Sequence, residues 1–94
     1  MHFEWDEEKE KRNIIKHGID FSMAALVFYD ENRLEWYDER HSDEEDRFIT
    51  IGQIGNVTVI LLVVYTDRGD AIRIISARKA TKKERRLYDD TQGN

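Results

Sequence analysis

The sequence has no cysteine and no proline, and only five of its 94 residues are glycine. Without cysteine, the chain can form neither disulfide bonds nor thiolate metal sites, and nothing points to an oxidising compartment. Without proline, Ser/Gly-rich linkers or internal repeats, the secondary-structure elements are expected to follow one another closely. A chain of this length is too short to divide into two cores, so we expect one domain with one site.

Long apolar runs and a targeting segment are also lacking. The longest apolar run, VTVILLVVY at residues 57–65, is too short to cross a bilayer as a helix. The N-terminus, MHFEWDEEKEK, is acidic where a signal peptide is basic and then apolar. Hydrophobic residues make up 39% of the chain and charged residues 37%, which is typical of a small core under a very polar surface. The sequence therefore predicts a globular protein of the cytoplasm.

The start of the chain predicts a helix over about residues 7–17. Asp6 is a favourable N-cap, and Gly18 is a favourable left-handed stop after a basic last turn. The apolar face of this helix is thin and consists mainly of Ile14 and Ile15. We therefore expect the helix to lie against the rest of the protein rather than inside it.

A second helix and four strands are expected to follow. Asp20 is a favourable cap for a short helix with the sequence MAALVF at residues 23–28. Further along, apolar residues recur at every second position, which is the period of β-strands. Gly55-Asn56 is a two-residue hairpin signal, and the strand after it is apolar on both faces, which places it at the centre of the sheet. The expected strands are RLEWY (33–37), RFITIGQI (47–54), VTVILLVVYT (57–66) and AIRIISA (71–77).

The sequence closes with a third helix. Thr81 and Glu84 have the spacing of a capping box, which starts a helix that runs to about Tyr88. The order of elements predicts an α+β fold in which N-terminal helices pack on a four-stranded antiparallel sheet and a C-terminal helix follows.

Basic residues are outnumbered by acidic ones in the whole chain, 15 against 20, but they are concentrated near its C-terminus. The formal net charge is −5. Residues 1–50 hold 7 Lys and Arg against 15 Asp and Glu, whereas residues 51–94 hold 8 against 5. The stretch 68–86 alone contains eight basic and two acidic residues. A local basic face on an acidic body indicates a site for an anionic partner.

The placement of two lysines indicates which kind of anion this basic face would bind. Lys82 and Lys83 occupy the first positions of the expected third helix, where their charge opposes the helix dipole. A phosphate at this N-terminus would favour both side chains and the free backbone N–H groups. The remaining basic residues of the region can converge on the same end of the sheet: Arg68, Arg73, Arg78 and Lys79. This pattern is typical of a protein that binds a phosphate backbone.

The last expected strand limits which side chains can share one groove. In a regular strand, Arg73 and Ala77 point to one face of the sheet. Ser76 and Arg78 then point to the other face. Arg73 lies between isoleucines, so its guanidinium must find a carboxylate, a phosphate or solvent. A structural ion pair and a functional role are equally open for it.

Several side chains could transfer protons. His17 could act as a general acid or base, although a histidine at a helix C-terminus also complements the dipole. His41 lies in the acidic loop DERHSDEED near Asp38, but contiguous carboxylates lack the alternating spacing of a metal-binding loop, so a solvated charged loop is expected. Tyr65 and Tyr88 bracket the basic region and could donate a proton or stack on a base; alternatively, both are amphipathic edge residues.

Three stretches, in order, resemble the BrnT toxins of bacterial type II toxin–antitoxin pairs. They are FEWDEEKEKRNIIKHGIDFSMAALVF, DEEDRFITIG and VVYTDRGDAIRIISARKATKKERRLY. The resemblance implies a RelE-like ribonuclease domain over residues 1–94. It also implies a cytoplasmic endoribonuclease that blocks translation by cutting RNA, and a small DNA-binding, BrnA-like antitoxin that neutralises it.

The resemblance extends to individual positions. The family pattern recurs here as Lys16, His17 and Gly18; Arg47; Thr66 and Arg68; and Arg73, Ser76 and Arg78, with Glu84 and Tyr88 following. A metal-free ribonuclease needs a base, cations for the phosphorane and an acid for the leaving group. We expect the catalytic residues to come from Lys16, His17, Arg73, Arg78 and Tyr88, with no metal and no cofactor. The expected RNA-binding residues are Arg47, Arg68, Ser76, Lys79, Lys82 and Lys83.

Two other functions remain open at the level of sequence. The same basic face could belong to a non-catalytic binding module that docks an acidic protein or a nucleic acid. A DNA-binding component is a weaker alternative, because no helix-turn-helix with a basic recognition helix is visible. Charge alone does not separate an enzyme from a binding module.

Overall fold

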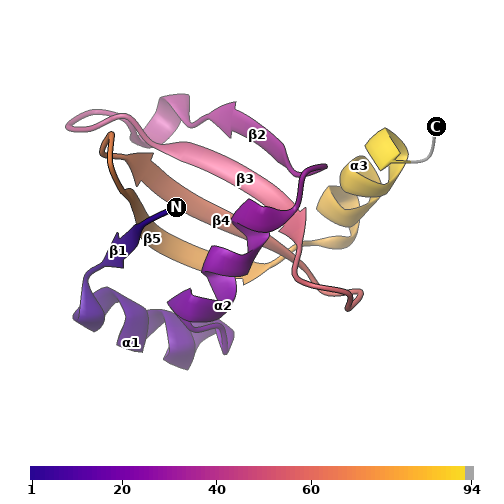
Figure 1. Ribbon diagram of the computed structural model, residues 1–94, viewed down its shortest axis with the longest axis horizontal. Coiled ribbons are helices and arrows are strands. Elements are labelled where there is room, and N and C mark those ends of the chain that lie inside the picture. The colour runs from indigo at the N-terminus through magenta and orange to yellow at the C-terminus, as the bar shows by residue number, and fades with distance from the viewer. Residues whose placement is uncertain (93–94) are drawn as a thin grey trace.

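The fold is a five-stranded mixed sheet with helices on both faces and along one edge (Figure 1). The structure is a computed structural model that describes residues 1–92. Four antiparallel strands follow one another as expected, and the apolar strand β4 is central. These strands are β2 (Leu34–Tyr37), β3 (Phe48–Gln53), β4 (Ile60–Asp67) and β5 (Ile72–Lys79).

The expectation of a purely antiparallel, four-stranded sheet is wrong. A fifth strand, β1 (Phe3–Trp5), pairs in parallel with β5 and gives the sheet order β1-β5-β4-β3-β2. Three residues are too few to show a period of two, and the partner strand lies near the other end of the chain. Phe3 and Trp5 pack against the main core, whereas Glu4, between them, faces the opposite side of the sheet.

Helix α1 (Glu7–His17) has the expected bounds and caps. The carboxylate of Asp6 accepts hydrogen bonds from the backbone N–H groups of Glu8 and Lys9, at 2.8 and 3.3 Å. Gly18 ends the helix in the left-handed region, at φ 71°. The local signals of sequence therefore define the bounds of this helix.

The buried face of α1 differs from the expectation. Ile14 and Ile15 are 44% and 86% exposed, and the residue that is buried is Asn13. Its side-chain amide donates to the backbone oxygen of Ala77 at 2.8 Å and accepts from the N–H of Ala77 at 3.1 Å. Strand β1 pairs with β5 only as far as Ile74, so Asn13 satisfies backbone groups that a longer edge strand would have paired. A polar clamp, not an apolar face, joins α1 to the sheet.

The second expected helix is split in two. Helix α2 (Phe21–Ala25) begins where Asp20 accepts the N–H of Met23 at 2.7 Å, and it continues into a 3-10 turn, η1 (Leu26–Tyr29). Both pack on one face of the sheet and form the main core with β4 and β5. The fully buried members of that core include Phe21, Val27, Leu61, Val63 and Ile74.

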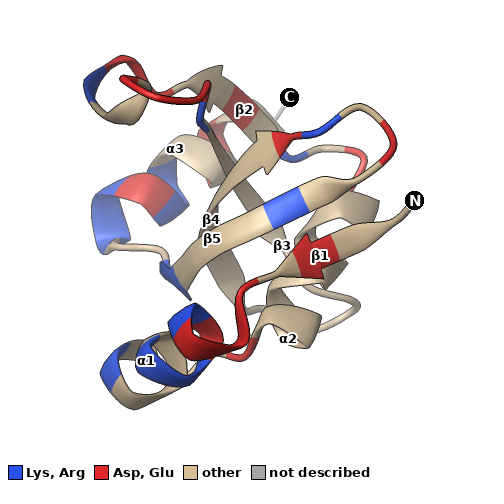
Figure 2. Ribbon diagram, turned by 90° about the vertical axis from the view of Figure 1, so that its left-hand side faces the viewer, with Lys and Arg blue, Asp and Glu red and all other residues tan. Residues whose placement is uncertain are grey.

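Helix α3 (Lys82–Gln92) covers part of the other face of the sheet, as Figure 2 shows. The expected capping box is present: the N–H of Glu84 donates to the Thr81 hydroxyl at 3.2 Å, and the N–H of Thr81 donates to the Glu84 carboxylate at 2.8 Å. The helix continues beyond Tyr88, which packs in a smaller core with Ile51 and Leu62. Within residues 1–92, no helix is long and apolar enough to cross a membrane.

The hairpin between β3 and β4 is longer than the two-residue turn predicted at Gly55-Asn56. Strand β4 begins at Ile60 instead of Val57, and the N–H of Ile54 bonds the carbonyl of Val59 at 3.1 Å. A tight type I′ turn needs positive φ at both central residues, but only Gly55 has one, at 56°. The polar residues of the loop therefore stay outside the ladder.

Strand β5 contains a β-bulge that changes which residues share a face. Val64 lies opposite Ser76 and Tyr65 lies opposite Ile74, so Ile75 has no partner on β4. The regular alternation that separated Arg73 from Ser76 and Arg78 is therefore wrong. All three now lie on the face opposite the main core, which we call the open face.

Candidate functional site

The open face carries a hollow of about 380 Å³, which we call the open-face hollow. Its apolar floor comes from β3 and β4, and polar groups come from the end of α1, the loop after β2, the end of β5 and the start of α3. In Figure 2, α1, α3 and that loop all lie on the left of the sheet. The residues that line the hollow are His17, Trp36, Asp38, Arg40, His41, Ile49, Leu62, Val64, Ser76, Ala77, Arg78 and Glu84.

His17 is placed in the hollow by the clamp on α1. Asn13 and His17 are four residues apart, so they lie on the same side of the helix. The two hydrogen bonds between Asn13 and Ala77 therefore bring His17 beside the end of β5. Ser76 and Arg78 line the same hollow there. Lys16, the neighbouring candidate, is exposed and does not line it.

Arg78 is held in the hollow by a two-pronged ion pair. Its two terminal nitrogens donate to the two carboxylate oxygens of Glu84, at 2.7 and 3.0 Å. These bonds, followed by the N–H of Thr81, lower the pKa of Glu84 to about 2 although burial opposes the shift. The same carboxylate raises the pKa of Arg78. The guanidinium is thus a fixed and permanent cation.

The other lining groups suit a nucleotide. Trp36 is 39% exposed and presents an aromatic ring beside Ile49 and Val64, on which a base could stack. Arg40 adds a second cation at the rim. Ser76 contributes a hydroxyl that can donate to a phosphate oxygen.

The structure does not gather the remaining basic candidates at this hollow. Arg73 pairs with Glu4 at 2.8 Å, so the ion pair left open by the sequence is present. Arg68 pairs with Glu45 at 2.9 Å on the loop after β2. Lys82 lines a separate hollow on the outer side of α3, and Lys79 and Lys83 are exposed. Convergence of Arg73, Lys82 and Lys83 with Arg78 at one concavity is not observed.

The two candidate tyrosines use their hydroxyls inside the protein. Tyr88 is 5% exposed, and its hydroxyl donates to Asp30. Burial, followed by the bond to Asp30, raises the pKa of Tyr88 to about 12. Tyr65 is equally buried and bonds Glu35, and burial raises its pKa as well. Neither side chain lines the open-face hollow.

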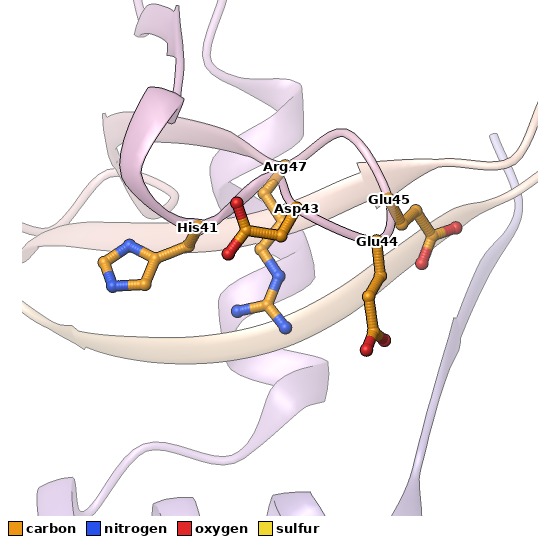
Figure 3. A pocket seen from close by; sticks show the side chains of 5 residues that line it. All are labelled: His41, Asp43, Glu44, Glu45 and Arg47. Atoms are coloured by element: carbon orange, nitrogen blue, oxygen red, sulfur yellow. The ribbon is translucent and has the colours of Figure 1, made fainter.

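Arg47 lies in a second hollow of about 350 Å³, formed by the acidic loop. Figure 3 shows its side chain running away from the loop, between His41 and Glu44 in that view. The other lining residues are Asp43 and Glu45, and His41 lines both hollows. Within residues 1–92, no group of three or more His, Asp or Glu side chains is arranged to hold a metal ion.

One feature of the site was missed by sequence reasoning. The acidic loop contains a 3-10 turn, η2 (Glu39–His41), and Asp38 before it is only 9% exposed. The carboxylate of Asp38 bonds Nδ1 of His41, at 3.1 and 3.3 Å. The spacing of three residues was a signal for this pair, but the surrounding run of carboxylates masked it.

Fold and site together define a small α+β protein whose open sheet face joins cations, imidazoles and an aromatic ring, a set suited to a phosphodiester. The chain belongs to the BrnT family. The family model described as "Ribonuclease toxin, BrnT, of type II toxin-antitoxin system" matches residues 5–84. A comparison with curated proteins found no match. The family is one of ribonuclease toxins that act with an antitoxin partner, and the match includes every residue that lines the open-face hollow.

Proposed function

We propose that the protein is a metal-independent, RelE-like endoribonuclease toxin, a single domain over residues 1–94, which cuts RNA in the cytoplasm and thereby inhibits translation. One observation carries the proposal. The fold brings His17, Ser76 and Arg78, from α1 and β5, into one hollow with an apolar and aromatic floor. Cleavage of a phosphodiester without a metal needs charge stabilisation and proton transfer, which a cation with a hydroxyl donor and an imidazole can supply.

The reaction that fits these groups uses the RNA's own 2′-hydroxyl. As its oxygen forms a bond to phosphorus, a base takes the hydroxyl proton, and the bond from phosphorus to the 5′-oxygen breaks. An acid gives that oxygen a proton. Arg78 stabilises the added negative charge on the phosphorane, Ser76 donates to a phosphate oxygen, and His17 transfers one proton. The products are a 2′,3′-cyclic phosphate and a 5′-hydroxyl.

The other basic candidates act at longer range in this proposal. Their side chains attract and orient the RNA backbone around the hollow, where each contributes affinity that falls with salt. This set comprises Lys16, Arg47, Arg68, Arg73, Lys79, Lys82 and Lys83. Tyr88 anchors α3 through Asp30 and so supports Glu84 and Arg78 indirectly.

The antitoxin is proposed to be a small, BrnA-like, DNA-binding protein. Residues 1–50 carry a large excess of acidic side chains, which complements a basic partner. Apolar side chains such as Ile15 are exposed and offer area for an amphipathic segment.

Replacement of Arg78 tests the activity directly. Purified chain, free of any partner, is incubated with RNA in the presence of EDTA, and fragments are resolved by electrophoresis. We expect cleavage by the wild type and a loss of about 100-fold or more in Arg78→Ala, because a preorganised charge stabiliser is removed. Arg12→Ala, which removes an exposed arginine of α1 away from the hollow, is the matched control and keeps the wild-type rate.

Two results would contradict the proposal. Folded Arg78→Ala that cuts at the wild-type rate would exclude the hollow as the active site. RNA binding without cleavage by the wild type would favour the non-catalytic binding module.

A further inference from the structure

We infer that His41 is the general base of the cleavage reaction and that Asp38 positions it. The inference rests on the proposed function, because it assigns a second proton-transfer group to the same open-face hollow. In the sequence, the three-residue spacing from Asp38 to His41 is masked by the other carboxylates of the loop. The structure singles out His41, because it pairs the imidazole with the buried carboxylate of Asp38.

The pair is rigid on the Asp38 side. The Asp38 side chain is 10% exposed, whereas that of His41 is 65% exposed. The N–H of Asp38 bonds the carbonyl of Arg47 at 2.9 Å, and the hydroxyl of Ser42 bonds the carbonyl of Asp38 at 2.5 Å. The same hydroxyl accepts the N–H of Arg47 at 3.0 Å. This ring of bonds closes the base of the loop, so Asp38 holds the imidazole from a fixed point.

The bond to Asp38 also selects the tautomer of His41. A carboxylate accepts, so Nδ1 of the ring carries a hydrogen and Nε2 keeps the lone pair that can take a proton. Histidine held by a carboxylate in this way acts as a base in many hydrolytic sites. Figure 3 shows the His41 ring set apart from Glu44 and Glu45, on the opposite side of Arg47.

The hollow then contains two imidazoles, one for each of the two proton transfers of the reaction. The charged and titratable side chains that line it with His41 are His17, Asp38, Arg40, Arg78 and Glu84. Arginine does not give up its proton in proteins, and Glu84 is bound to Arg78, so the proton transfers are left to the histidines. His41 takes the proton of the 2′-hydroxyl through Nε2, and His17 gives a proton to the 5′-oxygen. The pair of histidines returns to its starting state by exchange with water.

Single substitutions give the first test. His41→Gln is expected to lower the cleavage rate by about 100-fold or more, as is typical when a general base is lost. The chain has three histidines, and His2→Gln is the matched control, because His2 is exposed and lies outside the hollow. Circular dichroism should show all variants folded, since His41 is largely exposed.

A substrate with a different leaving group distinguishes the general base from the general acid. RNA with sulfur in place of the bridging 5′-oxygen has a leaving group that needs no proton. On this substrate His17→Gln is expected to recover to within about 10-fold of the wild type, whereas His41→Gln keeps its full defect. Recovery of His41→Gln would overturn its assignment as the base.

Asp38 is a positioning residue and needs a different readout. Asp38→Asn is expected to lower kcat by about 10-fold or more at unchanged KM, because substrate contacts remain while the tautomer is lost. In the His41→Gln background, the same substitution is expected to have no further effect. Additive losses would assign Asp38 a merely structural role.

The inference and the proposed function fail differently. If the wild type cuts RNA and Arg78→Ala does not, but His41→Gln matches His2→Gln, then only the role of His41 is overturned. If the wild type does not cut RNA at all, the proposed function is overturned and the inference falls with it.

Discussion

At the scale of single residues, Glu84 joins the fold to the site. Its carboxylate closes the capping box of α3 and also holds Arg78 in the hollow. The sequence predicted the capping box, because donor and acceptor are three residues apart. It did not predict the ion pair, because Arg78 and Glu84 meet only when the chain turns from β5 into α3.

The effect of Glu84→Gln on the free energy of unfolding, measured at several pH values, tests the strength of the Arg78–Glu84 ion pair. Folding lowers the pKa of Glu84 from 4.5 to about 2, so the carboxylate stabilises the protein above pH 4.5 and loses that effect as pH falls towards 2. We expect Glu84→Gln to cost about 1–2 kcal/mol at pH 6, after allowance for solvent screening, and almost nothing near pH 2. Urea unfolding at several pH values measures this difference.

The control for this experiment is Glu31→Gln, which removes an exposed carboxylate. A cost that stayed constant between pH 6 and pH 2 would show that the carboxylate's charge does not contribute.

At the scale of elements, the local signals were the reliable ones. The caps at Asp6, Gly18 and Asp20 and the central place of β4 follow from short stretches of sequence, and all were confirmed. The sequence did not predict strand β1, the bulge at Ile75 or the long hairpin. These features depend on partners elsewhere in the chain and leave no periodic pattern in the local sequence. The site departs from this division, because Asp38 and His41 are only three residues apart and their pair was still missed among the many carboxylates of the loop.

Asn13→Ala tests the clamp between α1 and β5. The substitution removes three hydrogen bonds to buried backbone groups of Ala77 and Ile19. We expect a loss of about 2–4 kcal/mol in the free energy of unfolding, because those groups are left without partners. Asn32→Ala, at an exposed position, should cost less than about 0.5 kcal/mol. Equal effects in chemical denaturation would show that α1 is held by other contacts.

At the scale of the whole molecule, charge is divided between an acidic first half and a basic C-terminal region. The folded chain keeps this division, but it fixes Arg78 in the hollow and leaves most other basic residues of the C-terminal region outside it. A small candidate site on an acidic body supports the proposal of a toxin that acts locally on RNA and has a basic partner.

Expression in bacteria tests whether the hollow carries the toxicity and the rest of the chain binds the partner. The chain alone is expected to arrest growth and the incorporation of labelled amino acids, and co-expression of its genomic neighbour should restore both. The two proteins should then co-purify. Arg78→Ala should lose toxicity but keep the partner, because the substitution alters the hollow alone. Growth without arrest, and a chain that never retains its neighbour, would contradict the proposed toxin–antitoxin pair.

The bulge in β5 has a further consequence for how this strand can change. Ile75 is the one residue that resets the alternation, so the interior receives Ile74 and Ala77 while the open face receives Arg73, Ser76 and Arg78. Removing Ile75 would leave a regular strand in which Arg73, Ser76 and Arg78 keep the open face and Ile74 and Ala77 keep the interior. Arg73 and Arg78 therefore share a face at a spacing of five only through the bulge, and they would share it at a spacing of four without the bulge. We therefore expect loss of Ile75 to leave the two arginines in place, whereas an exchange that kept the length of the strand but removed the bulge would turn Arg73 towards the core.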